Sequence, residues 1–579
     1  MLNSLFDNVL HGVRQRRAAG DAATALEVGN SAAALKLLEP ALRATPDDAV
    51  LVTRMGQTLI ERDQLARGIE LLEKAVRLAP DLVEARVAYA AQLRYAGRIG
   101  LALEHLEAAA RGAPDDPAVR RALLRPLAET CNWPALARER AAIEARIAGG
   151  KAWTDFVMPM DALLLGLPAP ARRAAAEARA ADLERIERRA SHMGARRETR
   201  GSKLRIGYLS GDFRDHAVTH LAGELFRTHD RNKVEVLAFS YGRDDGSEYR
   251  RRVKEGADRF VEGRGLSHAE IARTIAGAGV DILVDLGGHA SGSRLGILAH
   301  RPAPLQAHYL GYPGTTGARF VDYFIADATV APAALDAEFS ERFVRLPDSF
   351  MVSDAAIAAA PVLDRGARTA HGLPADAFVF VNFNQPSRID PQVWAVWMAI
   401  LKAVPGSVLW LKQVNDIASA NLRAAADAAG IDPARLVFAP DVADKLAHVS
   451  RLRLADLGLD TFGRYNGHTS TADALWAGVP VITTPSDCFA GRVAASLLMA
   501  AGLAEGVAAD AGEYQSLAIA LAQDAGRLEG LRVGLVEARA RAPFFKPQRV
   551  VHALERAYSV MWDRYNAGLE PEPVTVAAA

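Results

Sequence analysis

The stretch NGHTSTADALWAGVPVITTP (466–485) predicts a loop, a helix start, a short helix, a tight turn and a buried strand. Its loop brings His468, Thr469 and Ser470 to the helix start, where free backbone N–H groups favour a phosphate. An ordinary capped helix, with Ser470 as N-cap and Asp473 three residues later, explains the same spacing. The residues of this stretch leave both interpretations open.

Apolar segments alternate with helical segments on both sides of this stretch. From about residue 377 onward the predicted strands are FVFVNFNQ (378–385), SVLWLKQ (407–413), RLVFAP (435–440), LADLGLDTF (454–462) and VPVITTP (479–485). An earlier series consists of LRIGYLS (204–210), KVEVLAFSY (233–241), DILVDLGGH (281–289), LQAHYLGYPG (305–314) and VDYFIAD (321–327). Apolar strands separated by helices predict parallel sheets covered on both faces. We therefore expect an α/β protein with two Rossmann-like sheets, joined around residues 330–375.

The N-terminal segment carries a repeat. Pro46, Pro80 and Pro114 lie 34 residues apart, and each is followed by Asp. Small and large apolar residues recur ahead of these prolines as paired helices require, so the segment resembles tetratricopeptide repeats. The register decays after Pro114, which predicts a degenerate or capping unit around Trp133. We expect an all-α solenoid whose concave face binds a polypeptide, with a purely structural extension as the alternative.

An Ala- and Arg-rich segment follows the repeat. From Ala169 it predicts one long helix with a charged face, then a polar linker from His192 to Lys203. Its glutamates interleave with its arginines, which argues against a nucleic-acid surface.

Bulk properties exclude several classes of protein. The 579 residues carry a formal net charge of zero, which argues against a nucleic-acid binder. Two cysteines give no disulfide framework or structural zinc site. No apolar run approaches the ~20 residues of a membrane span, and the N-terminus lacks a signal-peptide core, so we expect a cytoplasmic protein. The dinucleotide and Walker glycine motifs are absent, and the acidic pair Asp244-Asp245 sits in a polar turn, so neither a cofactor nor a metal is expected.

Polar residues gather at predicted strand ends, where ligands of open α/β sheets bind. In the second series these are Gln385, Arg388, Lys445 and His448. In the first series they are His216, His220, His289 and Tyr312. An isolated exposed cation is usually solvated, and a histidine at a strand end can cap or pack. The clustering of the second-series residues at one edge of their sheet favours binding or catalysis, whereas the first-series histidines can equally cap or pack.

Several motifs together carry a family resemblance. The motifs are NFNQ with IDP (382–385, 389–391), LGLDTF, NGHTSTADALWAGVPVITTP, GRVAASLL, SGDFRDHAVTHL (210–221) and RPAPLQAHYLGYPGTTG (301–317). In this order the chain resembles the protein O-linked N-acetylglucosamine transferase family over roughly residues 204–565. The resemblance implies a glycosyltransferase of type B. It also implies a UDP-GlcNAc donor, inverting and metal-independent transfer, and Ser/Thr hydroxyl acceptors on proteins.

The resemblance also implies roles for the donor residues. The 468–470 segment would hold the pyrophosphate, with Asp473 serving the donor from the first helical turn. Lys445 would neutralise the departing diphosphate, Gln385 would contact the phosphates, and His448 would contact the uridine.

On the acceptor side, His216 matches a candidate general base, with His220 close by, and His289 and Tyr312 are second-tier acceptor candidates. Arg388 stands where the family has lysine, and its planar fork is not equivalent to an ammonium. Donor preference or efficiency could differ for that reason.

The predicted organisation has five parts: helical repeats (1–150), a helical linker (151–203), an N-terminal Rossmann-like half (204–375), a C-terminal UDP-sugar-binding half (376–566) and a flexible tail (567–579). The alternatives are a transferase using another UDP-hexose or an Asn acceptor, a catalytically weak scaffold that binds UDP, and an epimerase. A protein or peptide acceptor would bind through the repeats, and homodimerisation is left open.

Overall fold

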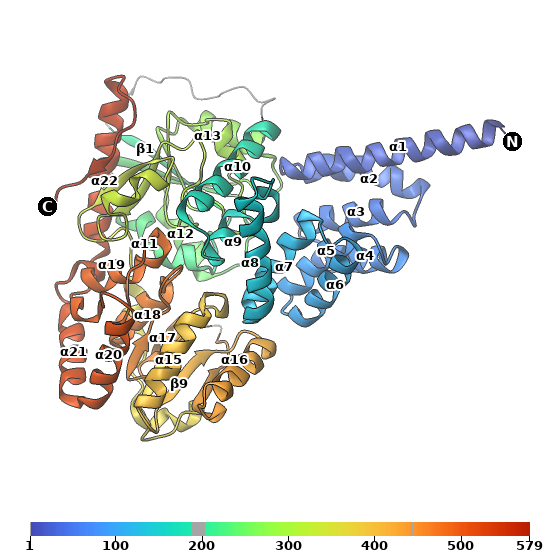
Figure 1. The fold of residues 1–579 in the computed structure, drawn as a ribbon. Helices are drawn as coiled ribbons and strands as arrows, with labels where there is room; N and C mark the ends of the chain where they lie inside the picture. Colours follow the sequence, from blue (N-terminus) through green and yellow to red (C-terminus); the bar gives the residue numbers. More distant parts are fainter. Residues whose placement is uncertain (1, 188–202, 443, 579) are drawn as a thin grey trace.

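A computed structural model describes residues 2–187, 203–442 and 444–578. Figure 1 shows a helical arm beside a body of two α/β halves, with α1 extending away from the body at the N-terminus. The predicted linker from His192 to Lys203 lies outside the described residues, apart from its last position. The predicted fold class is confirmed in outline: an all-α part precedes two parallel sheets.

The arm consists of antiparallel helix pairs. Its helices are α1 (Leu2–Glu27), α2 (Ser31–Ala44), α3 (Ala49–Glu61), α4 (Leu65–Leu78), α5 (Val83–Tyr95), α6 (Ile99–Gly112), α7 (Pro117–Glu129) and α8 (Trp133–Ala148). Pro46, Pro80 and Pro114 follow α2, α4 and α6, as the repeat predicts, because proline cannot continue a helix. The segment around Trp133, where the register decays, still forms a full helix pair, α7 and α8.

Each pair turns through one residue with positive φ, and these four residues are again 34 positions apart. They are Gly29, Asp63, Gly97 and Cys131, with φ values of 69°, 64°, 75° and 52°. All four turns face the body. The contacts are Val28 with His268, Asp63 with Arg264, Tyr95 with Ser291, and Cys131 with Pro386. The solenoid therefore touches both halves through equivalent positions of successive repeats.

The arm joins the body through η1 (Thr154–Phe156), α9 (Pro159–Leu164) and α10 (Ala169–Glu187). The long helix predicted from Ala169 is confirmed as far as Glu187. His268 Nδ1 and His300 Nε2 lie 2.6 and 2.8 Å from the Glu187 carboxylate. Burial alone would raise the pKa of Glu187, but the hydrogen bonds from both histidines lower it to about 2. This buried cluster fixes the end of α10 to the first half.

The first half is a parallel sheet with strand order β13-β7-β6-β5-β4-β1-β2-β3. Its strands are β1 (Leu204–Ser210), β2 (Val234–Ser240), β3 (Arg259–Glu262), β4 (Ile282–Asp285), β5 (Leu305–His308), β6 (Tyr323–Asp327), β7 (Arg342–Leu346) and β13 (Val574–Thr575). Its helices are α11 (Ala217–Thr228), α12 (Glu248–Gly256), α13 (His268–Ala278) and α14 (Gly296–Ala299). The five predicted strands are present, and β3, β7 and β13 were missed.

The second half is a smaller parallel sheet with order β10-β9-β8-β11-β12. Its strands are β8 (Val379–Asn382), β9 (Val408–Lys412), β10 (Leu436–Ala439), β11 (Leu457–Leu459) and β12 (Val481–Ile482). Its helices are α15 (Pro391–Ala403), α16 (Asp416–Ala428), α17 (Lys445–Leu452), α18 (Thr469–Ala477), α19 (Val493–Ala500), α20 (Ala511–Gln523) and α21 (Ala525–Ala538). All five predicted strands lie here.

Short 3-10 helices connect these elements. They are η2 (Ala333–Glu338), η3 (Ala355–Ala359), η4 (Arg365–Ala367), η5 (Thr369–His371), η6 (Pro386–Arg388), η7 (Pro433–Arg435), η8 (Phe489–Gly491), η9 (Ala504–Gly506) and η10 (Pro543–Phe545). Of these, η6 follows β8 and carries Arg388.

The chain ends on the first half rather than the second. Helix α22 (Pro547–Asn566) runs back along the body in Figure 1, and Tyr558 in it lies 3.0 Å, hydroxyl to hydroxyl, from Tyr208 of β1. The predicted flexible tail over residues 567–579 is wrong in this part, because Val574 and Thr575 form β13 and pair with β7. The predicted boundary of the second half, 376–566, also differs from the structure. It takes in α22, but the buried face of α22 packs against the first sheet. One apolar cluster spans both halves as a result.

Candidate functional site

The loop before α18 lies at the carboxyl edge of the second sheet. His468, not Ser470, holds the N-cap position, and its side chain makes no capping bond. The predicted Ser470 cap is therefore wrong: Ser470 lies inside the first turn, and its hydroxyl donates to the Asn384 side chain instead. Thr469 is the first residue of the helix, and its side chain makes no hydrogen bond within the described residues. The first N–H groups of α18 consequently have no side-chain cap, as an anion site at a helix start requires.

An ion pair stands beside this helix start. The Lys445 ammonium lies 2.6 Å from the Asp473 carboxylate, and both side chains are largely buried. His448 Nε2 lies 3.6 Å from the same carboxylate. Burial, opposed by Asp473 and reinforced by Lys445, lowers the pKa of His448 to about 4, so its imidazole is neutral at physiological pH. Asp473 thus orients a lysine rather than capping its helix.

Arg388 is packed into the same edge. Its guanidinium donates to the Asn466 carbonyl at 2.7 Å and lies 3.9 Å from the centroid of the Tyr465 ring. Gln385, at the start of η6, is exposed, and its side chain makes no recorded hydrogen bond. Arg388 therefore holds the 465–466 backbone and brings positive charge to the loop, whereas Gln385 is open to a ligand.

His468 contributes hydrogen bonding rather than charge. Its Nε2 lies 3.1 Å from the Ala490 carbonyl, to which it donates. Burial and the charge of Arg388 lower the pKa of His468 to about 3, so the ring stays neutral. A neutral imidazole that donates through Nε2 leaves Nδ1 as an acceptor.

Asp460, which follows β11, is a site residue that the sequence did not single out. It is buried and accepts hydrogen bonds from Gly467 N–H at 2.7 Å and from the Thr483 hydroxyl at 2.7 Å. The Asn384 amide also donates to it, at 3.2 Å. Burial raises the pKa of Asp460 to about 6. Asp460 therefore holds the loop before α18 in place. The signal that could have identified it in the sequence is an acidic residue at the end of an apolar strand, in the motif LGLDTF.

His216 lies at the carboxyl edge of the first sheet and caps α11. Its Nδ1 accepts a hydrogen bond from Val218 N–H at 3.2 Å and lies 3.6 Å from the Asp212 carboxylate. Burial lowers the pKa of His216, with Asp212 opposing, so the neutral ring prevails near pH 7. A neutral ring whose Nδ1 accepts carries its proton on Nε2. In this geometry the outward nitrogen of His216 is a donor.

His220 marks where the two halves meet. Its Nε2 lies 2.7 Å from the Asp215 carboxylate, and its ring centroid lies 4.4 Å from that of Tyr249. Burial and the charge of Lys445, on the opposite half, lower the pKa of His220. Helix α11, which carries His220, contacts α18 of the second half, so the predicted donor and acceptor residues lie on adjoining elements.

The second-tier candidates have packing roles. His289 Nε2 donates to the Thr316 carbonyl at 2.7 Å, and burial lowers the pKa of its ring to about 4. Tyr312 is buried, donates to the Pro159 carbonyl at 3.1 Å and packs in an apolar cluster with Tyr465. Tyr312 thus joins α9 to both halves and is not open to a ligand, whereas His289 lines a cavity.

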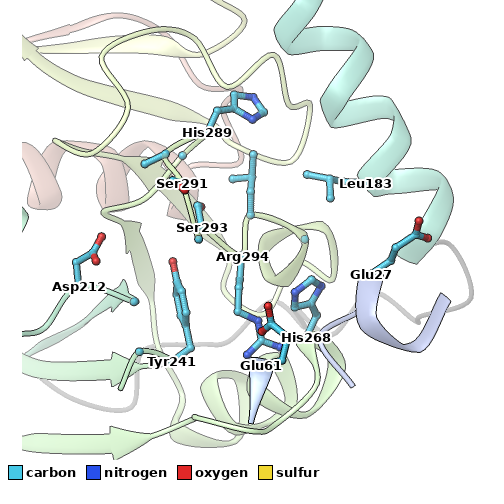
Figure 2. Close-up of a pocket in the computed structure, with 18 of the residues that line it drawn as sticks. Glu27, Glu61, Leu183, Asp212, Tyr241, His268, His289, Ser291, Ser293 and Arg294 are labelled. Carbon is cyan, nitrogen blue, oxygen red and sulfur yellow. The ribbon is translucent and has the colours of Figure 1, made fainter. Parts of the chain in front are cut away.

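That cavity has a volume of about 710 Å³ and lies between the solenoid and the first half. Figure 2 shows Tyr241, Ser293 and Arg294 on the side of the sheet, facing Glu27 and Leu183 from helices α1 and α10. Its volume suits a sizeable ligand, and its lining is predominantly polar. Asp212 also lines it, so the cavity extends to the carboxylate beside His216.

Two absences apply to the described residues. None of their His, Cys, Asp and Glu side chains form a group of three or more that could hold a metal ion. No helix among them combines the length and hydropathy that crossing a membrane requires.

Known proteins resemble this chain over most of its length. The sequence profile of glycosyl transferase family 41 matches residues 151–365 and 358–554, and a tetratricopeptide repeat profile matches residues 25–93. A probable UDP-N-acetylglucosamine–peptide N-acetylglucosaminyltransferase of Arabidopsis thaliana is 38% identical over 381 residues, covering 65% of this chain and 39% of the relative. The corresponding transferase of Caenorhabditis elegans is 29% identical over 485 residues, covering 65% and 42%. The chain therefore spans about two-fifths of the length of these relatives.

Among solved structures, a mutant O-GlcNAc transferase of Thermobaculum terrenum matches with a TM-score of 0.67 and 26% identity. The match covers 96% of this chain and 99% of that one. The arrangement of repeats and two sheets is thus shared along nearly the whole of both chains.

Proposed function

Since the chain belongs to glycosyl transferase family 41, we propose that it transfers N-acetylglucosamine from UDP-GlcNAc to serine or threonine hydroxyls of proteins. The observation that carries this proposal is the Lys445–Asp473 pair beside the uncapped start of α18, a helix that contacts α11, on which His220 lies. A cation, free N–H groups and a neutral imidazole converge there, as a departing diphosphate requires.

The donor occupies the second half. The N–H groups at the 468–470 helix start and the Lys445 ammonium bind the diphosphate, Gln385 contacts its phosphates, and His448 lies on the uridine side. Arg388 adds positive charge while holding the loop. Negative charge accumulates on the diphosphate as its bond to the sugar breaks, and a preorganised donor of this kind typically contributes ~10²–10³ in rate.

The acceptor lies against the first half. Its hydroxyl oxygen bonds to the anomeric carbon on the face opposite the leaving diphosphate, which inverts the configuration, and the hydroxyl proton passes to an oxygen of the departing diphosphate. The hydrogen bond at His216 Nδ1 favours a donor role for Nε2, holding a substrate oxygen rather than removing the proton. The cavity of Figure 2 provides the path by which an acceptor polypeptide passes from the repeats to His216.

The decisive experiment is a transfer assay with labelled UDP-GlcNAc on proteins of the host lysate. Wild type should label Ser/Thr residues and Lys445→Ala should not. UDP-glucose and UDP-GalNAc as competing donors test the sugar, and mapping the modified residues tests Asn as acceptor. UDP binding without labelling would contradict the transferase and favour a scaffold, and donor turnover without acceptor would favour an epimerase.

Three further properties belong to the proposal: the protein acts without a metal, lies in the cytoplasm, and binds its acceptor through the repeats. Transfer that persists in chelator tests the first, cell fractionation tests the second, and loss of protein labelling on deletion of α1–α6 tests the third. Light scattering tests whether the protein forms homodimers.

A further inference from the structure

The η6 segment, which presents Gln385 and Arg388 to the donor site, is weakly constrained by its own backbone. It is a single 3-10 turn, held by Arg388 N–H to the Gln385 carbonyl at 3.0 Å and by Ile389 N–H to the Pro386 carbonyl at 2.9 Å. Isolated turns of this kind are marginal in water. Its geometry must therefore come from neighbouring elements.

One anchor comes from within the second half. The Arg388 side chain donates to the Asn466 carbonyl and lies over the Tyr465 ring. This anchor holds the end of the Arg388 side chain and leaves the backbone of the turn free. A second anchor must hold the backbone.

That second anchor comes from the solenoid. The indole N–H of Trp133 donates to the Ile389 carbonyl at 3.0 Å, and the Trp133 ring centroid lies 5.9 Å from that of Trp394 on α15. The Cys131 thiol donates to the Pro386 carbonyl at 3.6 Å. Burial raises the pKa of this thiol to about 12, so it keeps its proton. Two carbonyl groups of the donor segment are thus held by the fourth repeat turn.

This turn is itself fixed to the second half. Asn415, the N-cap of α16, and Asn421 of α16 donate to the Glu129 and Thr130 carbonyls at 2.9 and 2.8 Å. Cys131 belongs to the apolar core that α15 and α16 build on the second sheet. The α7–α8 turn is therefore held firmly against the second half and can fix the position of η6.

The tryptophan is specific to this unit. Ser31, Leu65 and Ile99 occupy the same position of the first three repeats, and none has an indole N–H. The departure from the repeat pattern at Trp133 thus coincides with a contact to the donor segment.

We propose that Trp133, a residue of the helical repeats, is a positioning residue for the donor diphosphate, acting through the Ile389 carbonyl to set η6 and the side chains of Gln385 and Arg388. The proposal rests on the proposed donor site in the second half. It means that the repeats, besides meeting the acceptor, help to set donor affinity.

The test compares UDP binding of purified full-length variants by titration calorimetry. Trp133→Phe keeps an aromatic ring against Trp394 but removes the N–H donor together with part of the indole volume, a packing loss that the control variant must match. One neutral hydrogen bond corresponds to roughly a 3- to 10-fold change in affinity, so UDP should bind that much more weakly. The matched control, Asn421→Ala, removes a hydrogen bond from the same interface away from η6, and should change UDP affinity by less than about twofold while lowering Tm comparably.

A second measurement tests the route. In an Arg388→Ala background, Trp133→Phe should add less than about a twofold change, because residues that act through one another are not additive. In transfer assays Trp133→Phe should raise KM for the donor and leave KM for the acceptor unchanged. Equal UDP affinity in Trp133→Phe and wild type, equal losses in Trp133→Phe and Asn421→Ala, or full additivity with Arg388→Ala would each overturn the positioning role. Wild type that binds no UDP would overturn the proposed function itself, and the positioning role with it.

Discussion

Replacing His216 by Asn and by Ala separates a hydrogen-bonding role from a proton-removing one. Asparagine is a strong N-cap residue whose side-chain oxygen can accept from Val218 N–H while its amide nitrogen donates outward, as His216 does through Nε2. Alanine provides neither bond. Neither substitute can act as a base at neutral pH.

The structure gives a different magnitude for each role. Losing the cap costs about 1 kcal/mol of stability, which His216→Ala should show and His216→Asn should not. If Nε2 donates a neutral hydrogen bond to the substrate, His216→Asn retains transfer within ~10-fold. If His216 removes the acceptor proton, both variants lose ~10²–10⁴ equally.

The assay is single-turnover transfer from labelled UDP-GlcNAc, with Tm recorded for each variant. Ser247→Ala is the matched control, because Ser247 caps α12 of the same half by accepting from Arg250 N–H at 3.2 Å. It should lose comparable stability and keep its transfer rate. Equal and large rate losses in His216→Asn and His216→Ala would refute the hydrogen-bonding assignment.

Lys445→Ala removes the cation proposed to meet the departing diphosphate, so transfer should fall by ~10²–10³, at least as far as in His216→Ala, and an unchanged single-turnover rate would exclude that role. Protonation of His216 at Nδ1 would remove the acceptor that caps α11 and displace the ring, so kcat/KM should fall in acid. Because burial lowers the pKa of His216 and Asp212 opposes this, that acid limb should lie below 6.5. Asp212→Asn should move this limb to lower pH, and movement to higher pH would count against the geometry. Gly467→Ala would press a methyl group on the side chains that hold the loop, so UDP affinity by calorimetry should fall by about 10-fold or more. Gly277→Ala, which meets open space on α13, should leave that affinity unchanged.

Much of the fold is predictable because central strands of a parallel sheet are apolar on both faces. The strands β1, β4 and β8 carry that pattern, and the sequence locates them. Strand β3 has the sequence RFVE and is partly exposed. Its charged ends break the apolar pattern by which the other strands were predicted. Strand β13 is two residues long and gains its identity only by pairing with β7. Edge strands depend on tertiary partners that local composition does not specify.

The candidate site is predictable as a set of residues but not as a set of bonds. Lys445 and Asp473 lie 28 residues apart, and only the packing of α17 on α18 makes them an ion pair. His216 is not among the residue types that usually cap helices, so nothing in its spacing revealed that Nδ1 is occupied. Asp460 is buried under the loop and binds Gly467 and Thr483, and the periodicity of a strand does not predict which partners a residue at its end will bind.

The four left-handed turns divide the solenoid unevenly, with a consequence for retargeting the protein. The first three turns contact the first half, and the third also lies beside the start of α16 in the second half, whereas the α7–α8 turn is part of the apolar core of the second half. A chimera with foreign repeats must therefore be spliced ahead of α7, since a junction after α8 would remove part of the apolar core of the second half. The segment from α7 to α10 is better treated as the first part of the α/β body than as the last part of the helical arm.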